Sequence, residues 1–371
     1  MRARILLGGI IALSLTLLPS CADKARSKPW RGRIEIVEGV TVISNPKPPM
    51  HGLGALELAE ELSFGEAQGS KASAFYQAWY VAVNDAGEMF VMDQADSCVK
   101  VFSPDGTYVR SLGRRGQGPG ELQNPNTVHL ISDGRLVFED FYRGLVIFGP
   151  NGIFMDFLPA TGFVDVLVTP SGRIVARANT VADDRPAKEI RVFDGALRQQ
   201  AAFRLVPEEP RDPQVVKPYA GGFHWTLLGE DALAISEGNR YALDVFSLDG
   251  RPLRRILKDH DPIKISRDEI DRVEKNLRGR TAEFPPAHAA VRGMWADDEG
   301  NLIIGTYERS ADGRSLNYDV FDRDGRCLVK LAIPENVRPQ VWKGGKMYGL
   351  EEDAEGNQRV KICRLVWRVA H

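Results

Sequence analysis

Cysteines are few in this sequence, and their spacing excludes two common uses of the residue. Four of the 371 residues are cysteine. Cys98, Cys327 and Cys363 have neither metal-ligand nor Cys-x-x-Cys spacing, and their odd number excludes a complete disulfide framework. Each falls within an expected strand, so we expect three buried and unreactive thiols.

Long apolar runs and clustered basic residues are also scarce. The formal net charge is −2, and no stripe of lysine or arginine indicates a nucleic-acid partner. An uncharged run from Ile5 to Leu18 follows Arg2 and Arg4, which is typical of a secretory signal. Because this run is shorter than the roughly 20 residues that a spanning helix needs, we expect a cleaved signal peptide over residues 1–20.

The end of this leader contains a second signal. Leu18-Pro19-Ser20-Cys21 resembles the lipobox of bacterial lipoproteins. The resemblance implies that Cys21 is acylated and becomes the N-terminus of a membrane-anchored protein, with residues 21–30 as a tether. Ala22 follows in place of the aspartate that retains such proteins in the inner membrane, which favours the outer membrane. An ordinary signal peptide with a free cysteine is the alternative.

The strongest pattern in the mature chain is a repeated strand end. An apolar residue and a phenylalanine are followed, within four residues, by an Asp-Gly or Asn-Gly turn. The five copies begin at Val101-Phe102, Ile147-Phe148, Val192-Phe193, Val245-Phe246 and Val320-Phe321. This repetition indicates an array of similar β units.

A second repeated signal precedes each of the five phenylalanine turns and occurs once more after the last of them. It is a short turn, usually with glycine, followed by an apolar strand. Its six copies contain Gly87, Gly134, Gly172, Asp231, Gly300 and Gly345. Each unit accommodates four strands, so the sequence predicts an all-β, six-bladed β-propeller that occupies residues 31–371 as a single domain.

A propeller must be closed by pairing across the ends of its chain. The stretches Arg33–Val37 and Val40–Ser44 precede the first unit without partners of their own. We expect at least one of them to complete the last blade by pairing with Val360–Trp367. A capping box at Ser266 and Glu269 predicts one helical insertion near residues 266–279, between the fourth and fifth units.

The two faces of the predicted disc should differ. Because successive strands of a blade are antiparallel, all the glycine turns described above emerge on one face, the plain face. Longer irregular segments emerge on the other, the loop-rich face: 112–126, 178–188, 205–222, 258–290, 307–316 and 350–358. Binding usually resides in loops on a rigid scaffold, so we expect it there. Insertions that accumulated without a function are the alternative.

The most distinctive string on the loop-rich face is the glycine-rich run 113–122. Together with the phenylalanine turn before it and Asn124-Pro125 after it, this run resembles an NHL-type repeat. The chain is especially similar to the six-bladed propeller family of bacterial secreted and lipid-anchored proteins. That resemblance implies the fold but no common reaction.

The same string supplies the candidate ligand contacts. Arginine binds carboxylates and phosphates bidentately, so a glycine-rich loop with two arginines is suited to such a group. The candidates are Arg114, Arg115, Gln117 and Glu121. The alternative is a structural connector whose charged side chains pair with each other or with neighbouring blades.

Three histidines lie at or just before inner strands of different blades: His129, His224 and His288. Propeller enzymes can assemble a metal site from side chains that converge on the axis, and imidazole is a common ligand. No acidic partner pattern recurs beside these histidines. We therefore predict no cofactor, and a divalent-metal site at the three histidines is the alternative.

Taken together, these features predict a binding or scaffolding module. It is anchored outside the cytoplasm and presents its loop-rich face to a protein, peptide or glycan. No residue pattern supports a nucleophilic catalytic arrangement, and no catalytic residue is assigned. The alternative is a propeller enzyme, either a metal-dependent hydrolase of the lactonase type or a lyase, with its site on the channel axis.

Overall fold

The computed structural model describes residues 29–368, except 66–72, 142, 160–162, 183, 208–211 and 213. The predicted signal peptide, Cys21 and most of the tether therefore lie outside the described residues. Among the residues that are described, no helix is long and apolar enough to cross a membrane.

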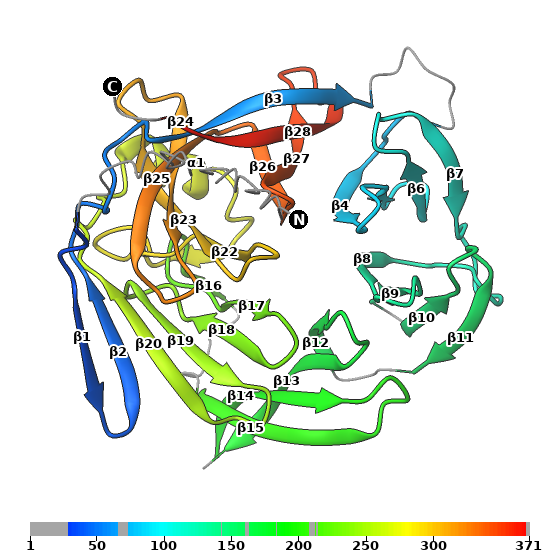
Figure 1. Cartoon of the computed structure of the whole chain (residues 1–371), viewed down its shortest axis with the longest axis horizontal. Coiled ribbons are helices and arrows are strands. Elements are labelled where there is room, and N and C mark those ends of the chain that lie inside the picture. Colours follow the sequence, from blue (N-terminus) through cyan, green and yellow to red (C-terminus); the bar gives the residue numbers. More distant parts are fainter. Residues whose placement is uncertain are drawn as a thin grey trace, which may run out of the picture.

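Six sheets, each with four antiparallel blade strands, form a ring around a central axis, as the repeats predict (Figure 1). Blade 1 consists of β4 (Ala78–Val83), β5 (Met89–Asp93), β6 (Cys98–Phe102) and β7 (Tyr108–Leu112). Blade 2 consists of β8 (Pro125–Leu130), β9 (Leu136–Asp140), β10 (Gly144–Phe148) and β11 (Phe154–Leu158). Blade 3 consists of β12 (Phe163–Val168), β13 (Ile174–Ala182), β14 (Arg185–Phe193) and β15 (Gln199–Pro207). Blade 4 consists of β17 (His224–Leu228), β18 (Ala232–Ser236), β19 (Ala242–Ser247) and β20 (Pro252–Lys258). Blade 5 consists of β22 (Gly293–Ala296), β23 (Leu302–Arg309), β24 (Ser315–Phe321) and β25 (Cys327–Pro334). Blade 6 consists of β26 (Val337–Lys343), β27 (Lys346–Glu352), β28 (Gln358–Trp367) and β3 (Leu56–Phe64).

The hydrophobic core is divided among the six boundaries between neighbouring blades. Each of six buried clusters combines residues from two adjacent blades, including one cluster that joins blade 6 to blade 1. Cys98, Cys327 and Cys363 are free and buried in these strands, as predicted. Burial raises the pKa of the Cys98 thiol and of the Cys363 thiol to about 11, which disfavours the reactive thiolate.

The glycines of the phenylalanine turns have a packing role as well as a turn role. Gly250 has a φ of +88°, and a Cβ atom built on it would lie 2.7 Å from the Cβ of Phe203 in β15, the outer strand of the preceding blade. Gly106 meets Phe64 of β3 in the same way, at 2.9 Å. The turns of blades 1, 2, 4 and 5 therefore seat these blades against the preceding blade, which gives a physical reason for the recurrence of the motif.

An N-terminal strand closes the ring by pairing with the last blade, but it is not one of the two stretches that we expected. β3 pairs antiparallel with β28 along Leu56–Phe64 (Figure 1). The predicted candidates instead form a hairpin, β1 (Arg33–Val37) and β2 (Val40–Asn45), and β2 extends blade 4 by pairing parallel with β20. Residues 56–64 alternate too weakly between apolar and charged side chains to be recognised as a blade strand.

Asn45, at the end of β2, fastens this hairpin to two blades. Its Nδ2 donates to the carbonyls of Leu257 at 3.2 Å and Gly325 at 2.9 Å. Its Oδ1 accepts from Trp30 Nε1 at 3.0 Å and from the backbone amide of Cys327 at 2.8 Å. The buried side-chain amide thus donates two and accepts two hydrogen bonds, and these bonds link blade 4 to blade 5.

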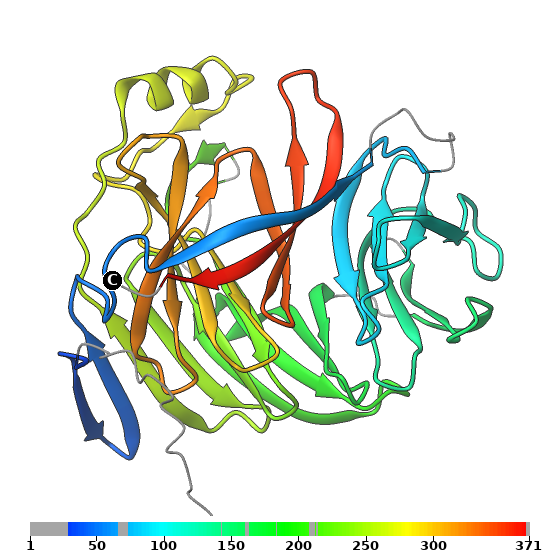
Figure 2. The same cartoon turned by 45° about the horizontal axis from the view of Figure 1, so that its top comes forward.

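The predicted insertion lies between blades 4 and 5 and contains α1 (Arg267–Glu274). The capping box forms as expected, with Ser266 accepting from the Glu269 amide and the Glu269 side chain accepting from the Ser266 amide. Two short strands, β16 (Val215–Val216) and β21 (Thr281–Ala282), pair in parallel and join this insertion to the segment before blade 4. Figure 2 shows α1 standing above the ring, well away from the tip of the β1–β2 hairpin.

Candidate functional site

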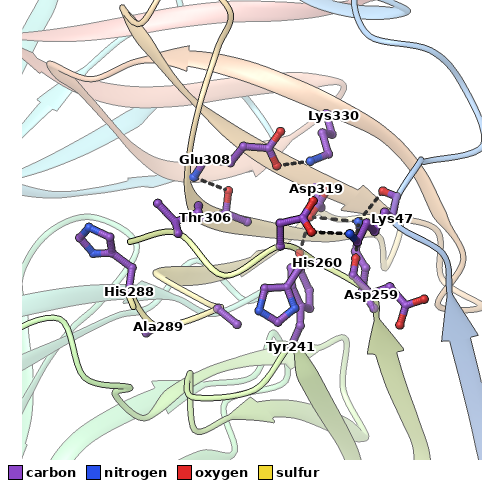
Figure 3. Close-up of a pocket in the computed structure, with 14 residues that line it drawn as sticks. Lys47, Tyr241, Asp259, His260, His288, Ala289, Thr306, Glu308, Asp319 and Lys330 are labelled. Atoms are coloured by element: carbon purple, nitrogen blue, oxygen red, sulfur yellow. Dashed lines mark hydrogen bonds and ion pairs between the residues drawn. The ribbon is translucent and has the colours of Figure 1, made fainter. Parts of the chain in front are cut away.

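A cavity of about 290 Å³ lies between blades 4 and 5, where the insertion leaves blade 4 and returns to blade 5. Residues 259–263 and 288–290 form part of its wall, and both segments belong to the loop-rich face. The charged and polar side chains around it are Lys47, Tyr241, Lys258, Asp259, His260, Asp261, His288, Thr306, Glu308, Asp319 and Lys330 (Figure 3). The loop-rich face therefore contains a polar cavity.

Three buried polar side chains meet at one wall of this cavity. Tyr241, which immediately precedes β19, donates a 2.6 Å hydrogen bond from its hydroxyl to Asp319 Oδ2 on β24. Lys258, the last residue of β20, lies with its Nζ 3.9 Å from the same oxygen and donates to the carbonyl of Lys47 at 2.9 Å. The side chains of Lys258 and Asp319 are 2% and 3% exposed, so this ion pair is shielded from solvent.

Burial controls the protonation of this cluster. It raises the pKa of Asp319 above its ordinary value, although Lys258 and Lys330 act in the opposite direction. Burial, together with the Asp319 charge, also holds the pKa of Tyr241 well above 10. The desolvation of Asp319 thus exceeds the attraction of its basic neighbours, as is common for buried ion pairs.

A second group of charges lines the outer part of the cavity. Lys330, on β25, forms an ion pair with Glu308, on β23. Asn317 donates from Nδ2 to Glu308 Oε1 at 3.1 Å, and the Glu308 side chain remains 43% exposed. Lys47 and Asp261 form a further ion pair that is largely exposed. The cavity therefore offers both charge signs, and these outer groups can exchange their internal partners for a ligand.

His288 borders the cavity, but its ring points away from Asp319 (Figure 3). The ring stacks on Tyr307 at 4.3 Å between centroids, and its Nε2 lies 3.3 Å from a carboxylate oxygen of Glu269 in α1. Nδ1 is buried and has no hydrogen-bond partner. His288 thus anchors the helical insertion above the cavity.

The structure does not group the three predicted histidines with one another. His129 lies on the inner strand of blade 2, 2.9 Å from Thr127 Oγ1, and burial lowers its pKa to about 4. His224 begins the inner strand of blade 4, and burial lowers its pKa as well. Within the described part of the chain, no three His, Cys, Asp or Glu side chains are grouped to hold a metal ion.

The glycine-rich string folds largely on itself. Arg114 pairs with Glu121 at 2.9 Å, and Glu121 Oε2 also accepts from the Gly118 amide at 2.8 Å. Arg115 donates to the carbonyl of Ala95 at 3.0 Å, and the Gln117 carbonyl accepts from Arg143 at 3.1 Å. The Arg114 side chain is 81% exposed, so it could still contact a ligand on this face.

Sequence reasoning did not identify the cluster of Tyr241, Lys258 and Asp319. No signal in the sequence marked it, because β24 contains Ser315 and Asn317 as well as Asp319, and β20 contains two arginines as well as Lys258. Their proximity depends on how blade 4 packs against blade 5, and 60 residues of insertion and strand separate the two charged positions in the sequence.

Comparison with known proteins supports the architecture. A family model described as a 6-bladed beta-propeller matches residues 78–146, which is blade 1 and most of blade 2. No curated protein sequence matches the chain. The fold of this chain is that of a six-bladed β-propeller.

Solved structures resemble nearly the whole propeller. An exported protein from Bacteroides fragilis is 11% identical, with a TM-score of 0.57 over 88% of this chain and 99% of that protein. A protein from Bacteroides vulgatus is 12% identical, with a TM-score of 0.51 over 85% of this chain and 99% of that protein. Virginiamycin B lyase from Staphylococcus aureus is 12% identical, with a lower TM-score of 0.47. Identities this low show a shared fold alone.

Proposed function

We propose that this chain is an extracytoplasmic binding propeller, anchored to the outer membrane through Cys21, that takes a polar end of a peptide or glycan into the cavity between blades 4 and 5. One observation carries the proposal: the buried cluster of Tyr241, Lys258 and Asp319 forms the wall of a cavity of about 290 Å³ on the loop-rich face.

The energetics of this cluster favour recognition over stability. A buried ion pair is often no more stabilising than apolar side chains of the same volume, because desolvation of both charges opposes their attraction. The raised pKa of Asp319 indicates that desolvation dominates here. The presence of these buried polar side chains is therefore better explained by ligand binding than by a contribution to the packing of the two blades.

The cavity limits what that ligand can be. Its volume is at the lower end of the range for small-molecule pockets, so it accommodates one side chain, one chain terminus or one sugar unit of a larger ligand. Lys330 and Glu308 offer a hydrogen-bond donor and an acceptor side by side. The ligand should therefore carry both donor and acceptor groups, as peptides and glycans do.

The outer ion pair allows a test that leaves the three buried side chains in place. Wild-type protein is applied to an array of short peptides and to an array of oligosaccharides, and the hits are titrated against Lys330→Met. Lys343→Met is the matched control, because Lys343 forms a comparable ion pair with Asp85 on the plain face. We expect at least a tenfold loss of affinity in Lys330→Met and no change in Lys343→Met.

Two results would reject the binding role. One is the absence of any ligand with a dissociation constant below about 1 mM on either array. The other is a hit that Lys330→Met and wild-type protein bind equally. A ligand lost instead in Arg114→Ala with Arg115→Ala would move the binding surface to the glycine-rich string.

Anchoring is tested separately from binding. Cys21→Ser removes the thiol that the lipobox resemblance marks for acylation. We expect wild-type protein in the membrane fraction and the variant in the soluble extracytoplasmic fraction, measured by fractionation of an expressing Gram-negative host. Equal membrane association of the two proteins would reject the lipid anchor and leave the cavity proposal unaffected.

A further inference from the structure

A second polar cluster lies on the two inner strands of blades 2 and 3. In blade 2, Thr127 of β8 and Glu139 of β9 are direct cross-strand partners. In blade 3, Asp165 of β12 and Arg177 of β13 are paired in the same way. In both blades an irregularity in the inner strand immediately precedes the pair, so the two pairs occupy equivalent positions.

The two carboxylates differ in their partners. Asp165 is bound bidentately by Arg177, at 2.8 and 3.0 Å, and also accepts from Trp225 Nε1 at 3.2 Å. Glu139 receives only neutral groups, with its Oε2 3.1 Å from Asn126 Nδ2 and 3.2 Å from Thr127 Oγ1. Glu139 is nevertheless only 6% exposed. Burial of an ionised carboxylate without a cation is unfavourable, so a bound cation would stabilise the ionised form of Glu139.

The neighbours of Glu139 supply no charge in place of a cation. Burial lowers the pKa of His129 to about 4, so its ring is neutral at neutral pH. His129 Nε2 lies 2.9 Å from Thr127 Oγ1, and Thr127 Oγ1 donates to Glu139 Oε2 at 3.2 Å.

Burial also governs the ionisation of Glu139. Burial raises its pKa to about 7, and the negative charge of Asp165 acts in the same direction. Burial and the Glu139 charge raise the pKa of Tyr80, on the inner strand of blade 1, to about 12. The titratable groups around Glu139 are thus a neutral histidine, a neutral tyrosine and an Asp165 that Arg177 already neutralises.

We propose that this inner-strand cluster is a second binding site, which takes a primary alkylammonium group such as the head of a lysine side chain, with Glu139 as its counter-ion. Glu139 Oε1 makes no hydrogen bond among the described residues and is not among their fully buried unpaired atoms, so it keeps a small exposed area. Thr127, Asp165 and Tyr80 around it are half-buried.

The geometry distinguishes an ammonium from other cations. A guanidinium binds best through both oxygens of a carboxylate, and here Oε2 is already engaged. Calcium requires six to eight oxygen ligands, whereas this site provides one free carboxylate oxygen, Glu139 Oε1. An ammonium with three donors can bond Oε1 and complete its shell with hydroxyl groups and water.

The test uses n-butylammonium chloride as the probe and n-butanol as its neutral counterpart, titrated by ligand-observed NMR at pH 6 and pH 8. Because Glu139 with a pKa of about 7 is about one tenth ionised at pH 6 and about nine tenths ionised at pH 8, we expect about tenfold tighter butylammonium binding at pH 8. Butanol should show no such gain.

Two variants locate the effect. Glu139→Gln should bind butylammonium at least tenfold more weakly at pH 8 and lose the pH dependence. Glu88→Gln, which changes a half-buried carboxylate on the plain face that also accepts from an asparagine, should bind as wild type does. The proposal is overturned if wild-type protein binds butylammonium equally at both pH values or not at all, or if Glu88→Gln rather than Glu139→Gln removes binding. The wild-type pH comparison decides the matter even if a variant misfolds.

Discussion

The Tyr241 hydroxyl donates a 2.6 Å hydrogen bond to Asp319 Oδ2 across the boundary between blades 4 and 5. The bond connects two blades that the chain joins only through a long insertion, and it does so beside a cavity. With Lys258, 3.9 Å from the same oxygen, it places buried charge where a propeller otherwise packs apolar side chains. Stability and binding can therefore be tested at the same residues.

The first prediction concerns the coupling of Lys258 and Asp319. Lys258→Met leaves the Asp319 charge buried with no close cation, and Asp319→Asn leaves Lys258 in the same state. We expect each change to lower the free energy of unfolding by about 3–5 kcal/mol. The double variant should lose about 1–3 kcal/mol less than the sum, because neither charge remains uncompensated. Urea denaturation measures all four proteins, and strictly additive losses would show that the pair does not interact.

The second prediction concerns the repeated turn glycines. Gly250 and Gly313 both have left-handed backbones, with φ of +88° and +69°. Alanine at either position should cost about 1–2 kcal/mol for the backbone conformation. At Gly250 the new methyl group would also lie 2.7 Å from Phe203, whereas nothing lies within 4 Å at Gly313. Gly250→Ala should therefore cost a further 1–3 kcal/mol or so in denaturant titrations. Equal losses would contradict the role of these turns in blade packing.

The third prediction concerns pH and the inner-strand cluster. The pKa of Glu139 is raised to about 7, so its contribution to stability is complete below its unfolded value of 4.5 and is lost as pH rises through 7. The pKa of His129 is lowered to about 4, so its contribution is complete above 6.5 and is lost as pH falls through 4. Each contribution amounts to about 3 kcal/mol. Between pH 4.5 and 6.5, a rise in pH lowers the free energy of unfolding through Glu139 and raises it through His129, so the two effects oppose each other.

Glu139→Gln should leave His129 as the group of this cluster that makes the free energy of unfolding depend on pH. Stability of the variant should rise from pH 4 to pH 6.5 and then stay level with respect to this cluster, while wild-type protein loses stability toward pH 8. The difference in unfolding free energy, variant minus wild type, should therefore grow by up to about 3 kcal/mol between pH 4.5 and pH 8. A difference that does not change with pH would mean that Glu139 is ionised throughout this range.

The blades were predictable from the sequence because they are local. The turn at Gly106 and the strand before it lie within a few residues of each other, and the pattern repeats around the ring. The closing strand was misassigned because Arg33–Val37 and Val40–Ser44 look more strand-like than Leu56–Phe64, and only the register against β28 reveals the true partner.

The cavity was predictable only as far as the face that contains it. Strand direction placed the long connections on one side of the disc, and the cavity lies there. Lys258 and Asp319 could not be connected in advance, because their contact depends on the angle between two blades. Glu139 could not be singled out either, since its lack of a cation is visible only once Thr127 is known to be its cross-strand partner.

The most direct test of the central proposal is a crystal structure of the protein soaked with the tightest ligand from the peptide and oligosaccharide arrays. We predict that one residue or sugar unit of the ligand occupies the cavity between blades 4 and 5, with polar atoms within hydrogen-bond distance of Lys330 or Glu308. Ligand density on the plain face or at another surface, with this cavity unchanged, would contradict the account.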